Sequence, residues 1–393
     1  MAEWKECTIS DIGTVVGGAT PSTKKSENYN GGSIPWITPK DLSTFSGRYI
    51  SRGERNITEI GLNSCSTQLL PAHSVLFSSR APIGYVAIAA NEVCTNQGFK
   101  SVVPNENTDS LFLFYLLKYN KKKIEGMGSG TTFKEVSGNT MKNIVVNIPT
   151  DKGVQEKIAA ILGSIDHKIE ENEQINKNLE QQAQAVYYKM FSEVNTVPVE
   201  LSSIIDVRDG THDSPKAQAT GYYLITSKHL LPFGVDKASA NHISKADFNK
   251  INERSLVETQ DILMSMIGTI GLISYIPYET VDFAIKNVAL FKTSHTPELA
   301  YYFLCYLKSE KTLQHIGKCL AGSTQKYISL GELRKMPIYS PTTNEIREFN
   351  CLVKPMFENI VSRTYENALL AEMRDSLLPK LMSGELDVSK IDI

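Results

Sequence analysis

The longest regular pattern of apolar and polar residues in the chain is a heptad pattern between Val154 and Met190. Its seam positions recur with alternating spacings of four and three residues: Ile158, Leu162, Ile165, Ile169, Asn172, Asn176, Leu179, Ala183, Val186 and Met190. This spacing is typical of a helix that packs against another helix along one stripe. A second seam with the same spacing follows about 190 residues later: Phe349, Val353, Met356, Ile360, Arg363, Asn367, Leu370, Arg374, Leu377 and Leu381. We therefore predict two long helices that pair with each other within the chain.

Polar residues interrupt both seams at similar positions, and Asn176 and Asn367 occupy equivalent ones. A buried asparagine at a seam position costs stability but fixes the register of a helix pair, which favours pairing within the chain. The alternative is that each helix is an ordinary amphipathic helix lying on its own domain. Because proline removes a helical hydrogen bond, we expect the second helix to begin near Pro355 or to bend there.

The segments that precede the two helices are repeats of each other. The motif IPWITPKDL in the first half matches YYLITSKHL in the second, and VLFS matches ILMS further on. The match continues in the same order through FYLLK and LCYLK, and through the loops 132–137 and 324–329. Since the order is kept and the insertions are short, both lobes should share one fold.

Each lobe has a mixed pattern of strands and helices. Short apolar runs predict strands, among them 74–77, 84–89 and 100–103 in the first lobe, and 261–265, 271–276 and 289–292 in the second. A helix is expected next, at 109–119 and 297–308. A Gly-rich loop, a short helix capped by Ser137 or Ser329 and an apolar strand that ends at a proline complete each lobe.

The predicted fold is α+β, with two repeated mixed α/β lobes joined by two long antiparallel helices that form an intramolecular coiled coil with pseudo-two-fold symmetry. The expected boundaries are 1–150 for the first lobe, 151–195 for the central spacer helix, 196–342 for the second lobe, and 343–393 for the C-terminal spacer helix and tail. The central helix should extend roughly 50 Å, which suits two binding sites on one face of a duplex that repeats about every 34 Å. We expect a bivalent protein.

Composition narrows the function classes. The 393 residues carry a formal net charge of -2, which argues against binding nucleic acid over the whole surface. The two lobes are nevertheless slightly basic, and the helical segments are acidic. No apolar run has membrane-spanning length and the start MAEWKECTISDIG lacks signal-peptide features, so a cytoplasmic protein is expected. The six cysteines lack zinc-site spacing, which predicts reduced thiols and no metal.

No catalytic motif is evident in the sequence. A phosphate-binding P-loop motif is absent, and the glycines of 126–130 lack the strand–loop–helix context of a dinucleotide site. The segment 147–150, NIPT, is best interpreted as the end of a strand. We therefore expect a protein that is not an enzyme.

Two sets of polar loops recur at matching positions and are the candidate binding sites. The loops 17–22 and 208–216 offer hydroxyls, backbone N–H groups and basic side chains that suit phosphate oxygens; the alternative is that they are simple turns. The loops 129–134 and 322–326 precede helix N-termini, where anions are stabilised, and ordinary helix capping is the alternative. Gln325 is suited to pairing with an adenine edge. The candidate DNA-binding residues are Thr20, Lys40, Arg80, Thr131, Thr132, Lys134, Arg208, Thr211, His212, Lys216, Lys228, Lys286, Thr324, Gln325 and Lys326.

These repeated motifs resemble those of the specificity (S) subunits of type I restriction-modification systems. The resemblance covers nearly the whole chain and rests on IPWITPKDL with YYLITSKHL, FSSRAPIG, NQGF, RDGTHDSP, GSTQK, INKNLE in the first long helix and LPKLMSGE near the C-terminus. It implies that each lobe is a target-recognition domain that reads one half of an interrupted sequence in double-stranded DNA. The first lobe departs from the second at one point, with Thr132-Phe133 in place of Thr324-Gln325.

The resemblance also implies partners. The paired helices are expected to set the gap between the half-sites and to bind two methyltransferase (M) subunits, which endonuclease/translocase (R) subunits can join. Adenine methylation with S-adenosylmethionine would then belong to the partner, and this chain would hold no cofactor.

The resulting hypothesis is a non-catalytic, bivalent DNA-sequence reader whose two half-sites differ because its lobes differ. The alternative is a bivalent coiled-coil scaffold for protein interaction, with lobes that bind peptides and helices that dimerise between chains. Salt-dependent retention on DNA in the presence of a methyltransferase would separate these hypotheses. A stand-alone enzyme is the third choice.

Overall fold

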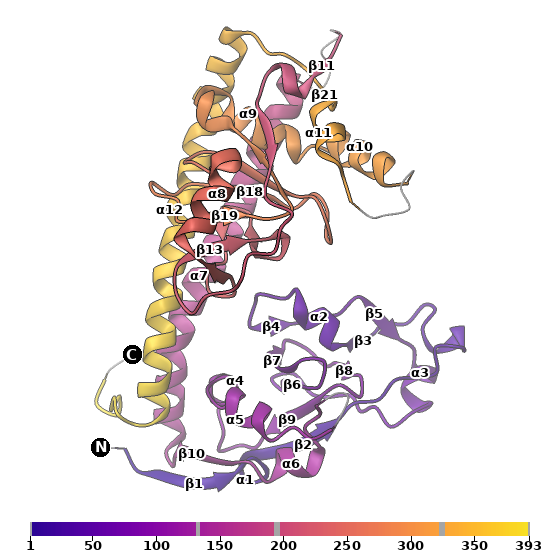
Figure 1. The fold of residues 1–393 in the computed structure, drawn as a ribbon. Helices are drawn as coiled ribbons and strands as arrows, with labels where there is room; N and C mark the ends of the chain where they lie inside the picture. Colours follow the sequence, from indigo (N-terminus) through magenta and orange to yellow (C-terminus); the bar gives the residue numbers. More distant parts are fainter. Residues whose placement is uncertain (1, 131–133, 192–196, 322–326, 392–393) are drawn as a thin grey trace. The chain divides into compact units, whose positions relative to one another are not determined.

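The computed structural model describes residues 2–130, 134–191, 197–321 and 327–391 (Figure 1). The chain divides into two compact units, Met1–Glu171 together with Asn367–Ile393, and Asn172–Glu366. We call these unit 1 and unit 2. None of the helices in the described ranges combines the length and the apolarity that crossing a membrane requires.

Two helices of 40 residues each, α7 (Lys152–Phe191) and α12 (Thr343–Met382), contribute to both units. Every predicted seam position on the two helices is buried or partly buried, which confirms the heptad assignment. The expectation that the second helix begins near Pro355 is wrong, because α12 already begins at Thr343. Buried residues on both sides of Pro355, the seam residue Val353 and its neighbour on the helix Phe357, pack into the core of unit 2 and stabilise the helix through the proline.

Contacts between the two helices show their direction. In unit 1, Asp166 pairs with Arg374 at 2.7 Å, and Asn367 Nδ2 donates to the Ile169 carbonyl at 3.4 Å. The partner on α12 thus moves toward the N-terminus as the position on α7 moves toward the C-terminus, so the helices are antiparallel as predicted.

Unit 2 shows the same direction. The buried Asn172 donates from Nδ2 to Glu366 Oε2 at 2.8 Å, and the Tyr187 ring packs against the Phe349 ring with centroids 6.4 Å apart. The polar seam residues Asn172 and Asn367 therefore each donate a hydrogen bond to an acceptor on the opposite helix.

The described residues of unit 1 form three sheets. The largest has the order β2-β9-β6-β7-β4, the next β5-β3-β8, and the smallest β1-β10. The strands are β1 (Trp4–Thr8), β2 (Gly13–Gly17), β3 (Ile34–Ile37), β4 (Tyr49–Ile50), β5 (Arg55–Ile57), β6 (Val75–Ser79), β7 (Ile83–Ala89), β8 (Cys94–Thr95), β9 (Lys100–Pro104) and β10 (Val145–Pro149).

Unit 2 repeats these sheets. The order β12-β20-β17-β18 matches β2-β9-β6-β7, the order β16-β13-β19 matches β5-β3-β8, and β11-β21 matches β1-β10. The strands are β11 (Val199–Glu200), β12 (Val207–Asp209), β13 (Tyr222–Ile225), β14 (Leu230–Leu231), β15 (Gly234–Val235), β16 (Asn241–Ile243), β17 (Ile262–Ser265), β18 (Ile273–Tyr275), β19 (Phe283–Ile285), β20 (Val288–Phe291) and β21 (Pro337–Ile338). In each three-stranded sheet the central strand is antiparallel to one neighbour and parallel to the other. The predicted repeat is thus confirmed at the level of strand order and direction.

Short helices connect the strands. Unit 1 has α1 (Ile9–Ile12), η1 (Ser26–Asn28), α2 (Pro39–Ser43), α3 (Glu59–Asn63), α4 (Ser110–Tyr119), α5 (Lys121–Gly126) and α6 (Gly138–Lys142). Unit 2 has η2 (Leu201–Ser203), η3 (Ser227–His229), α8 (Lys245–Ser255), η4 (Thr293–His295), η5 (Pro297–Leu299), α9 (Ala300–Leu307), α10 (Glu310–Ala321) and α11 (Leu330–Arg334). The predicted caps are present, because Ser137 Oγ accepts from Thr140 N at 3.0 Å and Ser329 Oγ accepts from Glu332 N at 3.2 Å.

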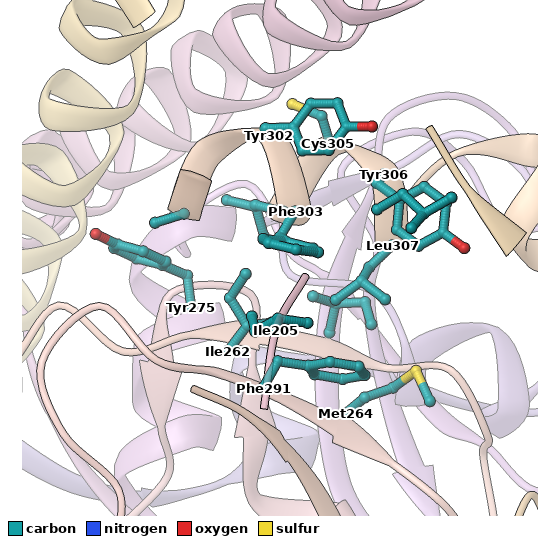
Figure 2. Close-up of a cluster of buried hydrophobic side chains, with 14 of the residues drawn as sticks. Ile205, Ile262, Met264, Tyr275, Phe291, Tyr302, Phe303, Cys305, Tyr306 and Leu307 are labelled. Atoms are coloured by element: carbon teal, nitrogen blue, oxygen red, sulfur yellow. The ribbon is translucent and has the colours of Figure 1, made fainter. Parts of the chain in front are cut away.

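The core of unit 2 joins the sheet to both kinds of helix. Figure 2 shows side chains of α9 above the four-stranded sheet, with Phe303 and Leu307 directed toward Ile262 and Phe291. From α7 and α12 the same cluster receives Ala183, Tyr187, Phe191, Phe349, Val353 and Phe357. Unit 1 is built likewise, with Ile158, Leu162 and Leu381 in its core.

One ionic cluster is buried beside the core of unit 2. The side chains of Lys292 and Asp261 are 1% and 0% exposed, and their Nζ and Oδ2 atoms lie 2.6 Å apart. Lys292 Nζ also donates to Glu258 Oε2 at 2.7 Å and to the Leu256 carbonyl at 3.1 Å. Three acceptors thus compensate the ammonium group for the loss of water.

Replacing Lys292 with methionine should lower the free energy of unfolding by about 3–5 kcal/mol, because it leaves the Asp261 carboxylate buried and unpaired. Hydrogen exchange of β17 and β20, measured by mass spectrometry on the whole chain, should show the loss of protection. The matched control is Lys237→Met, which breaks a 2.6 Å pair with Asp282 whose side chains are 31% and 46% exposed. That exposed pair should contribute about 1 kcal/mol or less, and equal losses in both variants would contradict the assignment.

Candidate nucleic-acid interface

The loop 17–22 lies against the end of strand β8. A Cβ added to Gly18 would lie 2.3 Å from the Thr95 carbonyl oxygen, so no other residue fits without a shift of the backbone. The next residue, Ala19, donates its N–H to the same carbonyl at 3.0 Å. This close approach fixes the backbone immediately before the candidate residue Thr20.

Thr20 contacts Gln97, a residue that was not among the sequence candidates. The Thr20 hydroxyl donates to Gln97 Oε1. Gln97 is exposed at the tip of a tight turn in which Asn96 Oδ1 accepts from Gly98 N at 2.9 Å. Asn96 N donates to the Ile37 carbonyl at 3.0 Å, where β3 ends. The turn that carries Gln97 is therefore attached to the ends of two parallel strands.

Two basic candidates of the first lobe lie beside this turn. Lys40 is in the short helix α2, which follows β3 directly, and Arg80 follows β6, whose last residue bonds to the turn. Lys40 is 78% exposed and pairs with Glu54 at 2.7 Å, a hydrogen bond that raises the pKa of Lys40. Arg80 pairs with Glu135 at 3.4 Å. The remaining basic candidate of this lobe, Lys134, is also exposed and lies in the segment between α5 and α6.

The second lobe repeats this backbone arrangement. We call it the frame: a glycine and the N–H group of the next residue lie against the carbonyl that ends the outer parallel strand. A Cβ added to Gly210 would lie 2.2 Å from the Ile285 carbonyl oxygen, and Thr211 N donates to that carbonyl at 3.0 Å. Lys286 N donates to the Ile225 carbonyl at 2.9 Å, where β13 ends. The loop before Thr211 is thus attached to the end of β19, just as its counterpart is attached to β8.

His212 stands at the position that corresponds to Thr20, and it faces Asn287. His212 Nδ1 is 2.7 Å from Asn287 Oδ1, and His212 Nε2 is 3.1 Å from Asp209 Oδ2. Asn287 has a φ of 52°, in the left-handed region that asparagine tolerates better than most residues. Arg254, from α8, pairs with Asp209 and donates to the Gly210 carbonyl at 3.2 Å. Arg254 and Asn287 are further residues that sequence reasoning missed.

The basic candidates of the second lobe differ in their surroundings. Lys286 Nζ donates to Ser214 Oγ across the loop. Arg208 is engaged within the lobe, because its guanidinium pairs with Asp206 at 2.7 Å and donates to the Arg254 carbonyl at 3.3 Å. Two remaining candidates are exposed: Lys216 and Lys228.

Two hollows adjoin His212. One, of about 360 Å³, lies between the loop and α8 and includes Arg254. The other, of about 470 Å³, is lined by His212 and Asn287 and by two partly exposed apolar side chains, Ile267 and Tyr327. The polar pair His212–Asn287 and the apolar side chains beside it could offer a ligand hydrogen bonds and van der Waals contacts at the same place.

Five sequence candidates lie outside the described residues: Thr131, Thr132, Thr324, Gln325 and Lys326. Their suggested roles stay predictions. The structure does bring together Thr20, Lys40 and Arg80 in the first lobe, and Thr211, His212 and Lys286 in the second.

The groups gathered at these two edges are hydroxyls, amides, an imidazole and cations, some of which pair with the carboxylates of Glu54, Glu135 and Asp209. Within the described ranges, no group of three or more His, Cys, Asp or Glu side chains is arranged to hold a metal ion. Hydroxyl and amide groups bond to base edges, and lysine and arginine bond to phosphates. The arrangement is suited to binding a polyanion with hydrogen-bonding bases.

Comparison with known proteins gives a consistent result. The type I restriction modification DNA specificity domain matches residues 1–181 and 193–348. The type I restriction enzyme MjaIX specificity subunit of Methanocaldococcus jannaschii is 33% identical over 420 residues, which cover 99% of this chain and 95% of that protein. The EcoR124I/EcoR124II specificity subunit of Escherichia coli is 32% identical over 173 residues, covering 42% of this chain and 41% of that protein. The crystal structure of the S subunit from M. genitalium has the same fold, with a TM-score of 0.55 at 15% identity and coverage of 97% of this chain and 96% of that chain.

The contact of Gly18 leads to a stability prediction. Gly18→Ala should lower the free energy of unfolding by about 1–3 kcal/mol, because the added methyl group forces the backbone away from β8. The chain has two tryptophans, Trp4 and Trp36, and Trp36 Nε1 donates to the Ala19 carbonyl at 3.1 Å. Tryptophan fluorescence during urea unfolding therefore reports on this region. As control, Gly126→Ala adds a methyl group that meets no other part of the chain within 4 Å, and because Gly126 ends helix α5 it should keep the stability or raise it by up to about 1 kcal/mol. An equal loss of stability in the two variants would refute the prediction.

Proposed function

Because the chain belongs to the family of type I restriction-modification specificity subunits, we propose that each lobe reads one half of a bipartite, gapped site in double-stranded DNA. The chain is a non-catalytic specificity subunit. The alternative of a protein-interaction scaffold without DNA specificity finds no support in this family relationship.

The observation that carries the proposal is one interface frame built twice with different side chains. In each lobe a glycine loop is attached to the end of a parallel strand, and it presents a polar residue to an amide side chain. The polar residue is Thr20 in one lobe and His212 in the other. A common frame supports a common mode of binding, and the different side chains support two different half-sites.

The charges at the interface support weak DNA binding by the chain alone. Several cations near the loops are already paired with carboxylates, as in Arg80 with Glu135 and Arg254 with Asp209. Phosphate contacts contribute most of the affinity in protein–DNA complexes. Tight binding should therefore require partner subunits that add cations around the duplex, and tight, sequence-specific binding by the isolated chain would contradict this expectation.

The partners that fit are two methyltransferase subunits, which endonuclease/translocase subunits join. The long helices support docking, since Leu369 and Met373 of α12 are 66% and 52% exposed in unit 1, and Leu352 is 53% exposed in unit 2. Leu369 and Met373 are four residues apart and so lie on one face of α12, and adjoining exposed apolar side chains favour a surface that another protein covers. S-adenosylmethionine would bind to the methyltransferase subunits and not to this chain, and the complex would work in the cytoplasm.

The proposal is tested by expressing the chain with the methyltransferase subunit of its system and mapping methylated adenines at single-base resolution. A two-part motif with a fixed gap is expected. Methylation at a continuous motif, or no methylation despite a stable complex, would reject the proposal.

The same experiment tests whether the helices set the gap. Inserting seven residues into α7 between Glu171 and Asn172, and seven into α12 between Glu366 and Asn367, keeps the heptad seam in register. Each insert adds about 10 Å of helix, so the gap should lengthen by about three base pairs of duplex. An unchanged gap in an active complex would show that the helices do not determine it.

A further inference from the structure

We propose that Gln97 and Asn287 contact bases, one in each half of the DNA site, and that Thr20 and His212 orient them. The inference rests on the proposed function, because it names the residues through which each lobe would read its half-site.

The two amide residues occupy equivalent places in the repeat. Residues Ile37 and Thr95 face each other across β3 and β8, and Ile225 and Ile285 face each other across β13 and β19. Gln97 lies two residues after Thr95, and Asn287 lies two residues after Ile285. Both amides therefore project from the turn that follows the outer parallel strand.

The two orienting residues are equivalent as well. The residue whose N–H bonds to the strand-end carbonyl is Ala19 in the first lobe and Thr211 in the second. Thr20 and His212 are the residues that follow. The pairs Thr20–Gln97 and His212–Asn287 thus join the same two points of the same frame.

The side chains in the two pairs compensate each other in length. The short Thr20 meets the long Gln97, and the long His212 meets the shorter Asn287. Both residues of each pair differ between the lobes, yet the contact between them is kept. A contact that survives changes at both ends indicates that the orientation of the amide matters.

The contact leaves the amide suited to a base edge. Thr20 binds the Oε1 atom of Gln97, and His212 lies against the Oδ1 atom of Asn287. Each oxygen retains a second lone pair, and the contact does not use the NH₂ group beside it on the same amide. An amide with a donor and an acceptor side by side matches adenine, which presents an acceptor at N7 and a donor at N6. A phosphate presents only acceptors, so the basic side chains nearby are its better partners.

The test uses changes that keep the shape of the side chain but remove the NH₂ donor. Gln97→Glu and Asn287→Asp do this, and aspartate also tolerates the left-handed backbone at position 287. Each variant is expressed with the methyltransferase subunit, and the methylated adenines are mapped as for the unchanged chain. Gln97→Glu should reduce preference at one base position of one half-site by about tenfold. Asn287→Asp should have the same effect in the other half-site only.

Two matched controls introduce the same charge at exposed positions outside the candidate loops. Asn91→Asp changes an exposed residue whose Nδ2 donates to the carbonyl of its neighbour Glu92 at 2.9 Å. Asn241→Asp changes an exposed residue on β16, the edge of its sheet opposite to β19. Both should keep the original motif, and a change of motif in either control equal to that in the test variants would overturn the inference.

The outcomes separate this inference from the proposed function. If the unchanged chain directs no bipartite methylation, the proposed function fails. If the unchanged chain directs it and both test variants direct the same motif at the same level, the roles of Gln97 and Asn287 are refuted. Thr20→Val adds an independent measurement, because losing only the orienting bond should weaken preference at the same base position as Gln97→Glu.

Discussion

Each lobe completes its hydrophobic core with side chains from both long helices, and the rest of the structure depends on this. In unit 2, Tyr187 and Phe191 from α7 pack against Tyr302 of the lobe and against Phe349 of α12. In unit 1 the helices contribute Ile158, Leu162 and Leu381. The buried apolar area that stabilises the helices is therefore the same area that stabilises the lobes. A helix cannot shift along its axis without disturbing a sheet.

Polar groups at the edge of this core restrict the attachment of the first lobe and the two long helices to one alignment. The buried Asp166 of α7 accepts from the Tyr115 hydroxyl at 2.6 Å and pairs with Arg374 of α12, so one carboxylate joins lobe, first helix and second helix. Burial raises the pKa of Tyr115, which keeps its hydroxyl a donor. Arg48 of the first lobe donates to Glu170 and to the Gly163 carbonyl of α7. Apolar contacts tolerate small shifts, but these bonds require one alignment.

In each lobe, the backbone groups that form the frame are distinct from the side chains that we propose to contact bases. Backbone contacts hold the frame, namely the glycine that lies on a strand-end carbonyl and the N–H groups that bond to it. Side chains at the tips, such as Gln97 and Asn287, contribute little to the core and are free to differ. A duplicated backbone frame that carries different side chains in each lobe allows one fold to recognise two unlike half-sites.

The sequence by itself determined the long helices, their pairing, the repeat and the cap residues Ser137 and Ser329, because these follow from spacing and from local hydrogen bonding along the chain. The family resemblance was also visible in short motifs such as NQGF. Only the tertiary structure decided that Thr20 meets Gln97 and that His212 meets Asn287, since 77 and 75 residues separate the partners. Gly98 and its neighbours could be noticed in the sequence, but no local pattern shows which loop a turn will face. That choice depends on the pairing of parallel strands distant in the chain. Tertiary structure also decided that α12 continues through Pro355, because Val353 and Phe357 on either side of the proline pack into the core of unit 2.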